Sequence, residues 1–134
     1  MRRKLDFETK KLYCTLALKW CKKFFGQNEL KRTKLSLEFT TRKRSHKNRS
    51  VLGNYCFYRN KITIYLNANE TLYDIVSTVI HEYTHYLQSR NQYKIYQDHY
   101  YYSTNPYERE AKKNEEKYTD LCIKEIKKFL LGNI

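Results

Sequence analysis

The spacing of hydrophobic residues divides this chain into helical and extended segments. A repeat every three to four residues, typical of amphipathic helices, predicts helices over residues 5–25, 71–88 and 106–131. Alternation of apolar and polar residues, typical of half-buried strands, predicts strands over residues 35–40, 51–58 and 61–66. This order predicts an α+β fold with an N-terminal helix, a small and mostly antiparallel three-stranded sheet, and two C-terminal helices.

Residues at the ends of the predicted helices support these boundaries. Asp6 is the expected N-cap of the first helix, with Thr9 as the alternative. Thr71 and Asp74 resemble a capping box at the start of the second helix, with Asp in place of the usual Glu. Pro106 occupies the first position of the last helix, where proline is favoured.

Two parts of the chain depart from these patterns. Residues 91–105 are rich in tyrosine but have no clear hydrophobic period, so we expect a connector there. Gly53 interrupts a predicted strand, which indicates either a bulge or a close approach of another part of the molecule to the backbone.

The second predicted helix contains the sequence His81-Glu82-Tyr83-Thr84-His85, an H-E-x-x-H pattern. On a helix this spacing brings both imidazoles within reach of one zinc ion. Glu82 would accept a proton from the attacking water and deliver it to the leaving amine. The two histidines lie opposite the apolar stripe of the helix, so we expect them to face away from its hydrophobic layer; the stripe consists of Leu72, Ile75, Val76, Val79, Tyr83 and Leu87.

A catalytic zinc ion usually has three protein ligands and one open position, so the motif needs a third ligand. Glu108 and Glu110 lie in the first turns of the last predicted helix, one on each side of its apolar stripe. Periodicity does not choose between them, and Asp98 and His99 are weaker candidates. The pattern predicts one catalytic Zn²⁺ and a peptide or protein substrate.

Positive charge is concentrated before the motif. Residues 1–50 contain 16 Lys or Arg and 4 Asp or Glu, whereas residues 51–134 contain 11 and 10. We therefore expect a single domain, 1–134, with a basic part at 1–50 and a catalytic part at 51–134. The basic part could bind nucleic acid or an acidic partner, or be merely solvated; its densest run contains Arg42, Lys43, Arg44, Lys47 and Arg49.

The cysteines and the hydropathy of the chain indicate a reducing compartment. None of the four cysteines belongs to a C-x-x-C pair, so a zinc ribbon is not expected. Cys14 and Cys21 lie seven residues apart on one helix face and are expected in the core. The sequence has no secretory h-region and no apolar run of membrane-spanning length, so we expect a cytoplasmic protein without a membrane partner.

These residues resemble a known family. The stretch 80–88 is similar to the active-site helix of the zincin metallopeptidases, in particular the small single-domain gluzincins (minigluzincins) and SprT-like proteins. The stretch 105–111 is similar to their glutamate helix, where a small residue often follows the ligand glutamate by three positions. By this resemblance Ala111 points to Glu108 as the third ligand, with Glu110 as runner-up. Where many members have an Asp after that small residue, this chain has Lys112, so Glu115 or Glu116 would have to replace that carboxylate.

The resemblance implies a zinc peptidase, most simply an endopeptidase, that binds substrate in extended form along an edge strand, for which residues 51–58 are the candidate. It also implies a side chain that donates a hydrogen bond to the transition state. The sequence does not rank the candidates for this donor, which are His99, Tyr100, Tyr101, Tyr102 and Tyr107. Two other interpretations stay open: a nucleic-acid-binding module that uses the basic run, and a zincin-like interaction protein without catalysis.

Overall fold

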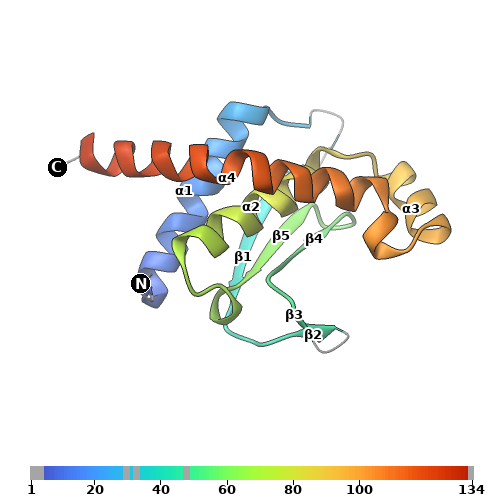
Figure 1. Cartoon of the computed structure of the whole chain (residues 1–134), viewed down its shortest axis with the longest axis horizontal. Coiled ribbons are helices and arrows are strands. Elements are labelled where there is room, and N and C mark those ends of the chain that lie inside the picture. The colour runs from blue at the N-terminus through green and yellow to red at the C-terminus, as the bar shows by residue number, and fades with distance from the viewer. Residues whose placement is uncertain (1–4, 29–30, 32–33, 47–48, 133–134) are drawn as a thin grey trace.

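The computed structural model describes residues 5–28, 31, 34–46 and 49–132 (Figure 1). In chain order its helices and strands are α1 (Phe7–Phe25), β1 (Ser36–Thr40), β2 (Ser45–His46), β3 (Arg49–Ser50), β4 (Gly53–Cys56), β5 (Lys61–Tyr65), α2 (Leu72–Leu87), α3 (Arg90–His99) and α4 (Pro106–Gly132). Single turns of 3-10 helix precede α2 and α4, namely η1 (Leu66–Ala68) and η2 (Tyr102–Thr104). The α+β class and the three predicted helices are confirmed.

Side-chain caps begin the first two helices as predicted. Asp6 Oδ1 accepts a hydrogen bond from the backbone N–H of Thr9 at 2.8 Å, so Asp6 rather than Thr9 caps α1. At the start of α2, Thr71 Oγ1 accepts from the Asp74 N–H at 3.2 Å, and Asp74 Oδ2 accepts from the Thr71 N–H at 3.1 Å. These bonds satisfy N–H groups for which a first helical turn has no backbone partner.

The sheet is mixed, which corrects the prediction of a mostly antiparallel sheet. Its strand order is β1-β5-β4, with β1 parallel to β5 and β4 antiparallel to β5. A tight turn joins β4 to β5, so those neighbours are antiparallel; the longer path from β1, through the β2–β3 hairpin and β4, lets β5 return parallel to β1. Alternating hydrophobicity identifies strands but contains no information about the direction of their partners.

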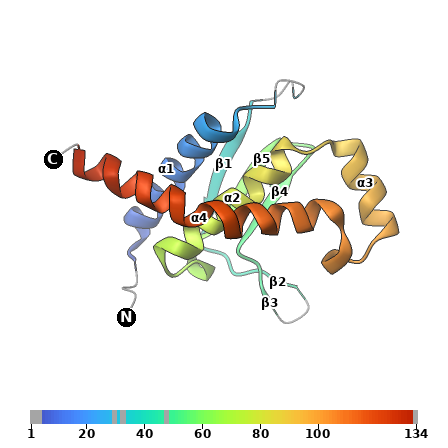
Figure 2. The ribbon, with the colours of Figure 1, turned by 45° about the horizontal axis from the view of Figure 1, so that its top comes forward.

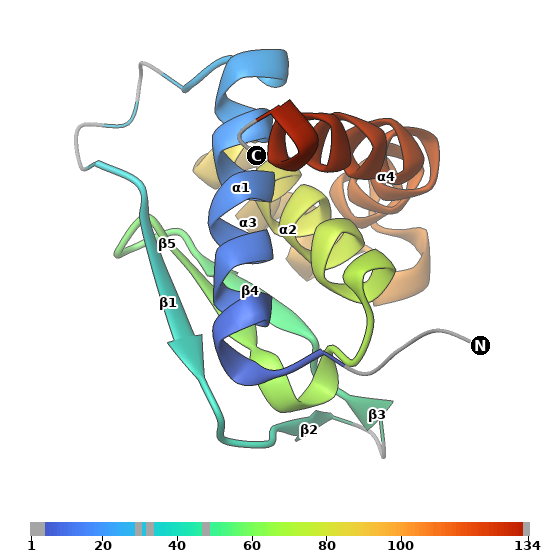
Figure 3. The same ribbon diagram turned by 90° about the vertical axis from the view of Figure 1, so that its left-hand side faces the viewer.

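The helices pack on one face of the sheet (Figure 3). Ile62 and Ile64 of β5 face them and are fully buried, whereas the intervening Thr63 is half-buried on the opposite face. Helix α2 packs against α1, β4, β5 and α4, and α4 crosses over it (Figure 2). Cys14 and Cys21 of α1 are buried in the same core, as predicted. Because α2 has neighbours on both sides, it is the central helix of the molecule.

The segment predicted as a connector contains a helix. Helix α3 covers Arg90–His99 and lies beyond one end of α2 and α4 (Figure 1). None of its residues is buried, so this helix does not insert a hydrophobic stripe into the core as an amphipathic helix usually does. Its contacts are aromatic instead: Tyr93 and Tyr96 pack on the ring of Tyr107 in α4, with centroids 6.4 and 5.0 Å away.

Candidate metal centre

Helix α2 presents His81 and His85 to α4. Full burial of Ile75, Val79 and Tyr83 on the apolar side fixes the rotation of α2 about its axis. The four-residue spacing then places the two imidazoles on successive turns, with ring centroids 5.1 Å apart. Both rings lie opposite the apolar side of the helix, as predicted, but they are not open to solvent: they contact Glu108 of α4, and His85 is only 4% exposed.

Helix α4 adds Glu108 to this pair. Glu108 is 7% exposed and lies in the first turn of α4, where the crossing over α2 brings it above both histidines. Its Oε1 pairs with His85 Nε2, and its Oε2 lies 3.8 Å from His81 Nε2. One ligand atom from each of the three residues lies within 4.8 Å of the others. His81, His85 and Glu108, which we call the triad, could therefore hold a metal ion.

A second set of contacts orients the imidazoles. His81 Nδ1 donates to Glu115 Oε1 at 2.9 Å, and His85 Nδ1 donates to Gln88 Oε1 at 2.7 Å. With Nδ1 occupied in each ring, Nε2 is the nitrogen that remains for a metal. Glu115 thus supplies the carboxylate that the resemblance led us to expect, in place of the position occupied by Lys112.

Glu110, the alternative third ligand, contacts Gln88 rather than the two histidines. Gln88 Nε2 donates to Glu110 Oε1 at 2.9 Å and to the backbone carbonyl of Tyr107 at 3.0 Å. Glu110 therefore holds the amide that in turn orients His85, and the structure brings Glu108 rather than Glu110 to the histidines. Gln88 was not among the predicted site residues, because it is the C-cap residue of α2 and lies outside the H-E-x-x-H pattern.

Charges in the metal-free triad are strongly coupled. Burial alone would lower the pKa of His81, but hydrogen bonds to Glu108 and Glu115 outweigh it and raise that pKa to about 10. Burial alone would raise the pKa of Glu108, but hydrogen bonds from His81 and His85 hold it well below its usual range. The hydrogen bonds between these groups therefore favour a negative carboxylate on Glu108 and a positive imidazole on His81.

Glu82 lies beside the triad and against strand β4. It is 7% exposed, and burial raises the pKa of its carboxyl, although the neighbouring imidazoles partly oppose that rise. Gly53 at the start of β4 leaves room for it: a Cβ on Gly53 would lie 3.2 Å from Glu82 Cγ and 2.6 Å from Thr78 Cγ2. The close approach predicted at Gly53 is confirmed, and it sets β4 directly against the motif.

Two tyrosine hydroxyls lie near the carboxylate of Glu108. Tyr102 of η2 is 72% exposed as a whole, but burial of its hydroxyl and its interaction with the Glu108 carboxylate raise the pKa of its phenol. Tyr93 of α3 packs edge-on against His85, with ring centroids 5.7 Å apart. Burial and the charges of Glu108 and Glu82 raise the pKa of Tyr93 to about 12. Both phenols are therefore neutral donors at neutral pH.

The other candidate donors lie further from this centre. Tyr107 packs its ring against Tyr96, while Tyr100 and Tyr101 are 48% and 84% exposed. Across the described ranges, no hydrogen bond or ring contact joins His99, Tyr100 or Tyr101 to the triad. Tyr93 was not among the sequence candidates. The spacing of Tyr93, Tyr96 and Tyr100, three and four residues apart, is a helical face and could have identified it.

The basic run lies at the start of the β2–β3 hairpin. Arg42, Lys43 and Arg44 are exposed. Arg49 belongs to β3, and Lys47 lies outside the described residues. The end of the run is part of a hairpin, in which two-residue strands pair Ser45 with Ser50 and His46 with Arg49.

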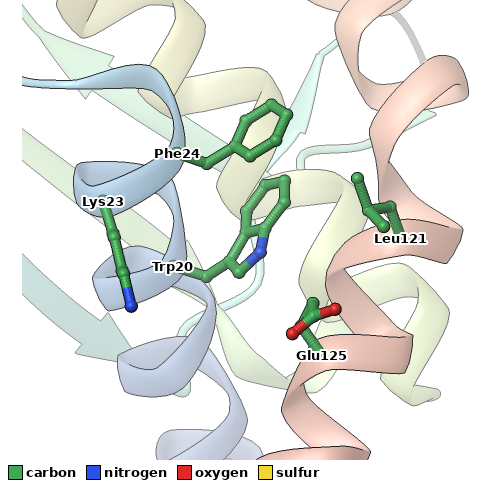
Figure 4. Close-up of a pocket in the computed structure, with 5 residues that line it drawn as sticks. All are labelled: Trp20, Lys23, Phe24, Leu121 and Glu125. Atoms are coloured by element: carbon green, nitrogen blue, oxygen red, sulfur yellow. The ribbon is translucent and has the colours of Figure 1, made fainter.

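A separate hollow of about 410 Å³ lies between α1 and α4 (Figure 4). Trp20, Lys23 and Phe24 line it from α1, and Leu121 and Glu125 line it from α4. Glu125 is 17 residues after Glu108, which corresponds to about 25 Å along one helix. This lining includes one carboxylate, one ammonium and no histidine or cysteine, so the metal-ligating groups belong to the triad.

Comparison of the chain with protein-family models, curated proteins and solved structures gives no match. Within the described part of the chain, no helix has the length and apolar character needed to cross a membrane. The geometry of the triad and its neighbours is therefore the basis on which a function can be proposed.

Proposed function

We propose that this protein is a zinc-dependent metallopeptidase that hydrolyses peptide bonds in protein or peptide substrates, as the resemblance to gluzincins implies. The convergence of His81, His85 and Glu108 from two helices supports this proposal most directly. Two imidazole nitrogens and one carboxylate form a ligand set of catalytic zinc sites, which keep a further position open for water and substrate.

The donor atoms suit zinc in two respects. Both histidines present Nε2 inward because Nδ1 is occupied, and both must be neutral to bind. Glu108 is already ionised, since its pKa lies well below its usual range. Zinc bound there would lower the pKa of a water molecule and polarise a substrate carbonyl.

Glu82 has the position and protonation behaviour of a general base. It follows His81 directly in α2, so its carboxylate lies next to the triad rather than among the ligands. Its carboxylate would accept the proton of the attacking water and then donate it to the amine nitrogen as the peptide bond breaks. The raised pKa favours the second transfer, because a carboxyl of ordinary acidity holds a proton weakly at neutral pH.

The hydroxyls of Tyr93 and Tyr102 are the best-placed donors for the oxygen that becomes negative in the transition state. Both are near Glu108, and both remain protonated at neutral pH. A neutral phenol aimed at that oxygen stabilises the transition state more than the substrate.

Metal analysis and one substitution test the proposal. We expect one zinc per chain in protein purified without added metal, and cleavage of an unfolded reporter protein. Glu82→Gln should retain zinc and lose about 10²–10⁴-fold in kcat/KM, because only the proton acceptor is removed. Glu116→Gln, a change to an exposed glutamate on α4, is the matched control. Equal cleavage by the Glu82→Gln variant would exclude the mechanism, and zinc binding without cleavage by either protein would indicate a non-catalytic metal protein.

A further inference from the structure

We propose that the substrate class of this site is an extended acidic segment of a protein, held along the outer edge of β4 by basic residues at both ends of that strand. The inference rests on the proposed peptidase function and specifies what the site would accept. Four structural features lead to it: β4 has a free edge, this edge lies beside the triad, the beginning of β4 is basic, and the end of β4 is basic.

Strand β4 forms one edge of the sheet and offers backbone groups to another chain. It pairs with β5 on one side, and none of the described strands pairs with it on the other. The Tyr65 N–H donates to the Leu52 carbonyl at 3.0 Å, so the backbone groups of Leu52 face β5. In an antiparallel pair every second residue faces the partner strand in this way. Asn54 and Cys56 then face β5, while the N–H and C=O groups of Gly53 and Tyr55 point outward. An extended peptide can add to such an edge.

This edge runs past the motif. At its beginning, Gly53 is in close contact with Thr78 and Glu82 of α2. Just beyond its end, Phe57 packs on the ring of Tyr93 with centroids 4.5 Å apart, and Tyr93 packs on His85. A peptide added along β4 would therefore pass beside both Glu82 and His85.

The beginning of β4 adjoins the basic run. The Val51 N–H donates to the Arg44 carbonyl at 2.7 Å, so Arg44 lies next to a residue only two positions before Gly53. Arg42, Lys43 and Arg44 are all exposed. A peptide that continues past this end of β4 meets three positive charges.

The end of β4 is also basic. Arg59 follows it and is exposed, and the guanidinium of Arg90 stacks on the exposed ring of Tyr58 at 4.0 Å. Residues 31–66 contain ten Lys or Arg and a single acidic residue, Glu38, which is paired with Lys61 at 2.5 Å. Since Glu38 lies on β1 at the opposite edge of the sheet, its charge does not offset the basic residues beside β4. Positive charge at both ends favours acidic residues on either side of the bond to be cleaved.

A polypeptide fits this edge better than a nucleic acid. Alternating N–H and C=O groups on Gly53 and Tyr55 match the backbone of an extended peptide, whereas a sugar-phosphate backbone has no N–H groups to pair with those carbonyls. We therefore assign the basic residues to an acidic protein segment.

Quenched fluorescent peptides test the assignment on the zinc-loaded full chain. The peptides share an uncharged central segment and have Glu, Ser or Lys at both ends. We expect kcat/KM to be at least about tenfold higher for the Glu-ended than for the Lys-ended peptide, and the difference to shrink at about 0.5 M NaCl, where surface charges are screened. Equal rates, or a preference that salt does not change, would overturn the proposal.

Two triple variants, each lacking three positive charges, test which surface causes the preference for Glu-ended peptides. Changing Arg42, Lys43 and Arg44 together to Ser should reduce the preference for Glu-ended peptides severalfold. Changing Lys124, Lys127 and Lys128 to Ser removes the same charge from the other end of α4 and should leave the preference unchanged. If both triple variants reduce the preference equally, net charge rather than this surface is responsible.

Binding to the zinc-loaded Glu82→Gln variant separates this inference from the proposed function. Anisotropy should show tighter binding of the Glu-ended than of the Lys-ended peptide even if the wild-type chain cleaves neither, in which case only the peptidase function fails. Absence of that preference would contradict the acidic-substrate inference. A single-stranded DNA oligonucleotide that binds more tightly than the Glu-ended peptide, and requires Arg42, Lys43 and Arg44, would assign the surface to nucleic acid instead.

Discussion

Each histidine of the triad uses its two ring nitrogens differently. The Nδ1 atoms bond to Glu115 and Gln88, and the Nε2 atoms face Glu108. Such outer bonds fix the tautomer and the ring orientation, so less rotational freedom is lost when a metal binds. The carboxylate of Glu115 also makes the His81 ring a stronger electron donor, because its negative charge favours positive charge on the imidazole.

Replacing Glu115 therefore tests the site at the scale of one residue. We expect Glu115→Ala to weaken zinc binding about 10–100-fold, because His81 loses the partner that orients it while all three ligands remain. Competition with a chromophoric chelator measures the affinity. Glu116→Ala removes the neighbouring, exposed carboxylate and should change the affinity little. The same loss in both variants would mean that general charge, rather than the bond to His81, is responsible.

Among elements, the contact between β4 and α2 places a sheet edge beside the motif. The strand can approach because Gly53 has no side chain, and the space that a Cβ would need is filled by Thr78 and Glu82. The Thr78 hydroxyl is itself fixed by a hydrogen bond to Asn69 Oδ1 at 2.8 Å, so it cannot move away without loss.

Gly53→Ala should accordingly destabilise the fold by about 1–3 kcal/mol, as overpacking in a close contact does. Urea unfolding of the metal-free protein measures the change in the free energy of unfolding. Gly132→Ala is the control, since a Cβ there has no neighbour within 4 Å. Adding Thr78→Ser removes the methyl group nearest to the new Cβ but keeps the hydroxyl, and it should restore part of the lost stability. If Gly53→Ala alone were neutral, β4 and α2 would lie further apart than the structure shows.

Helix α3 shows how an element can form without burying any residue. Contacts between aromatic rings stabilise this helix instead. The ring of Tyr93 packs against Phe57, which follows β4, and against Tyr107 of α4. The tyrosines of α3 recur at helical spacing, but most of the other residues are polar and none is buried, so a connector was predicted where the structure has a helix. The error concealed Tyr93, the tyrosine that packs on His85.

Across the whole molecule, α4 joins the candidate metal site to the core. Its N-terminal half places Glu108 and Glu115 over α2, and its C-terminal half buries Cys122 and Ile126 against the core that includes α1. A metal held by α2 and α4 would cross-link two helices that are far apart in sequence. Binding only to the folded state stabilises that state, by about 2.7 kcal/mol at 100 times Kd.

Zinc should therefore raise Tm, and the increase should grow with pH. In the metal-free protein the pKa of His81 is raised from 6.5 to about 10. The stability from its protonated form is complete below about 6.5 and is lost as pH rises toward 10, whereas zinc-bound His81 stays neutral throughout. Thermal scans with zinc or EDTA should thus give a smaller difference at pH 6.5 than at pH 9. His85→Ala should remove the difference at both pH values, and a difference that falls with pH would contradict the coupling.

The sequence by itself determined the parts that depend on local spacing. These are the caps at Asp6 and Thr71 and the rotation of α2 that turns His81 and His85 away from its apolar stripe. Such features depend on residues a few positions apart, whose relative geometry a helix or strand fixes.

Only the tertiary structure decided what depends on how elements meet. Glu108 and Glu110 are two residues apart at the start of α4, and the crossing of α4 over α2 alone brings one to the histidines and the other to Gln88. The parallel pairing of β1 with β5 and the approach of Tyr93 to His85 have the same origin. Packing between distant segments leaves no periodic pattern in either segment. The candidate ligands on α2 could therefore be predicted from its motif, whereas the groups around them could not.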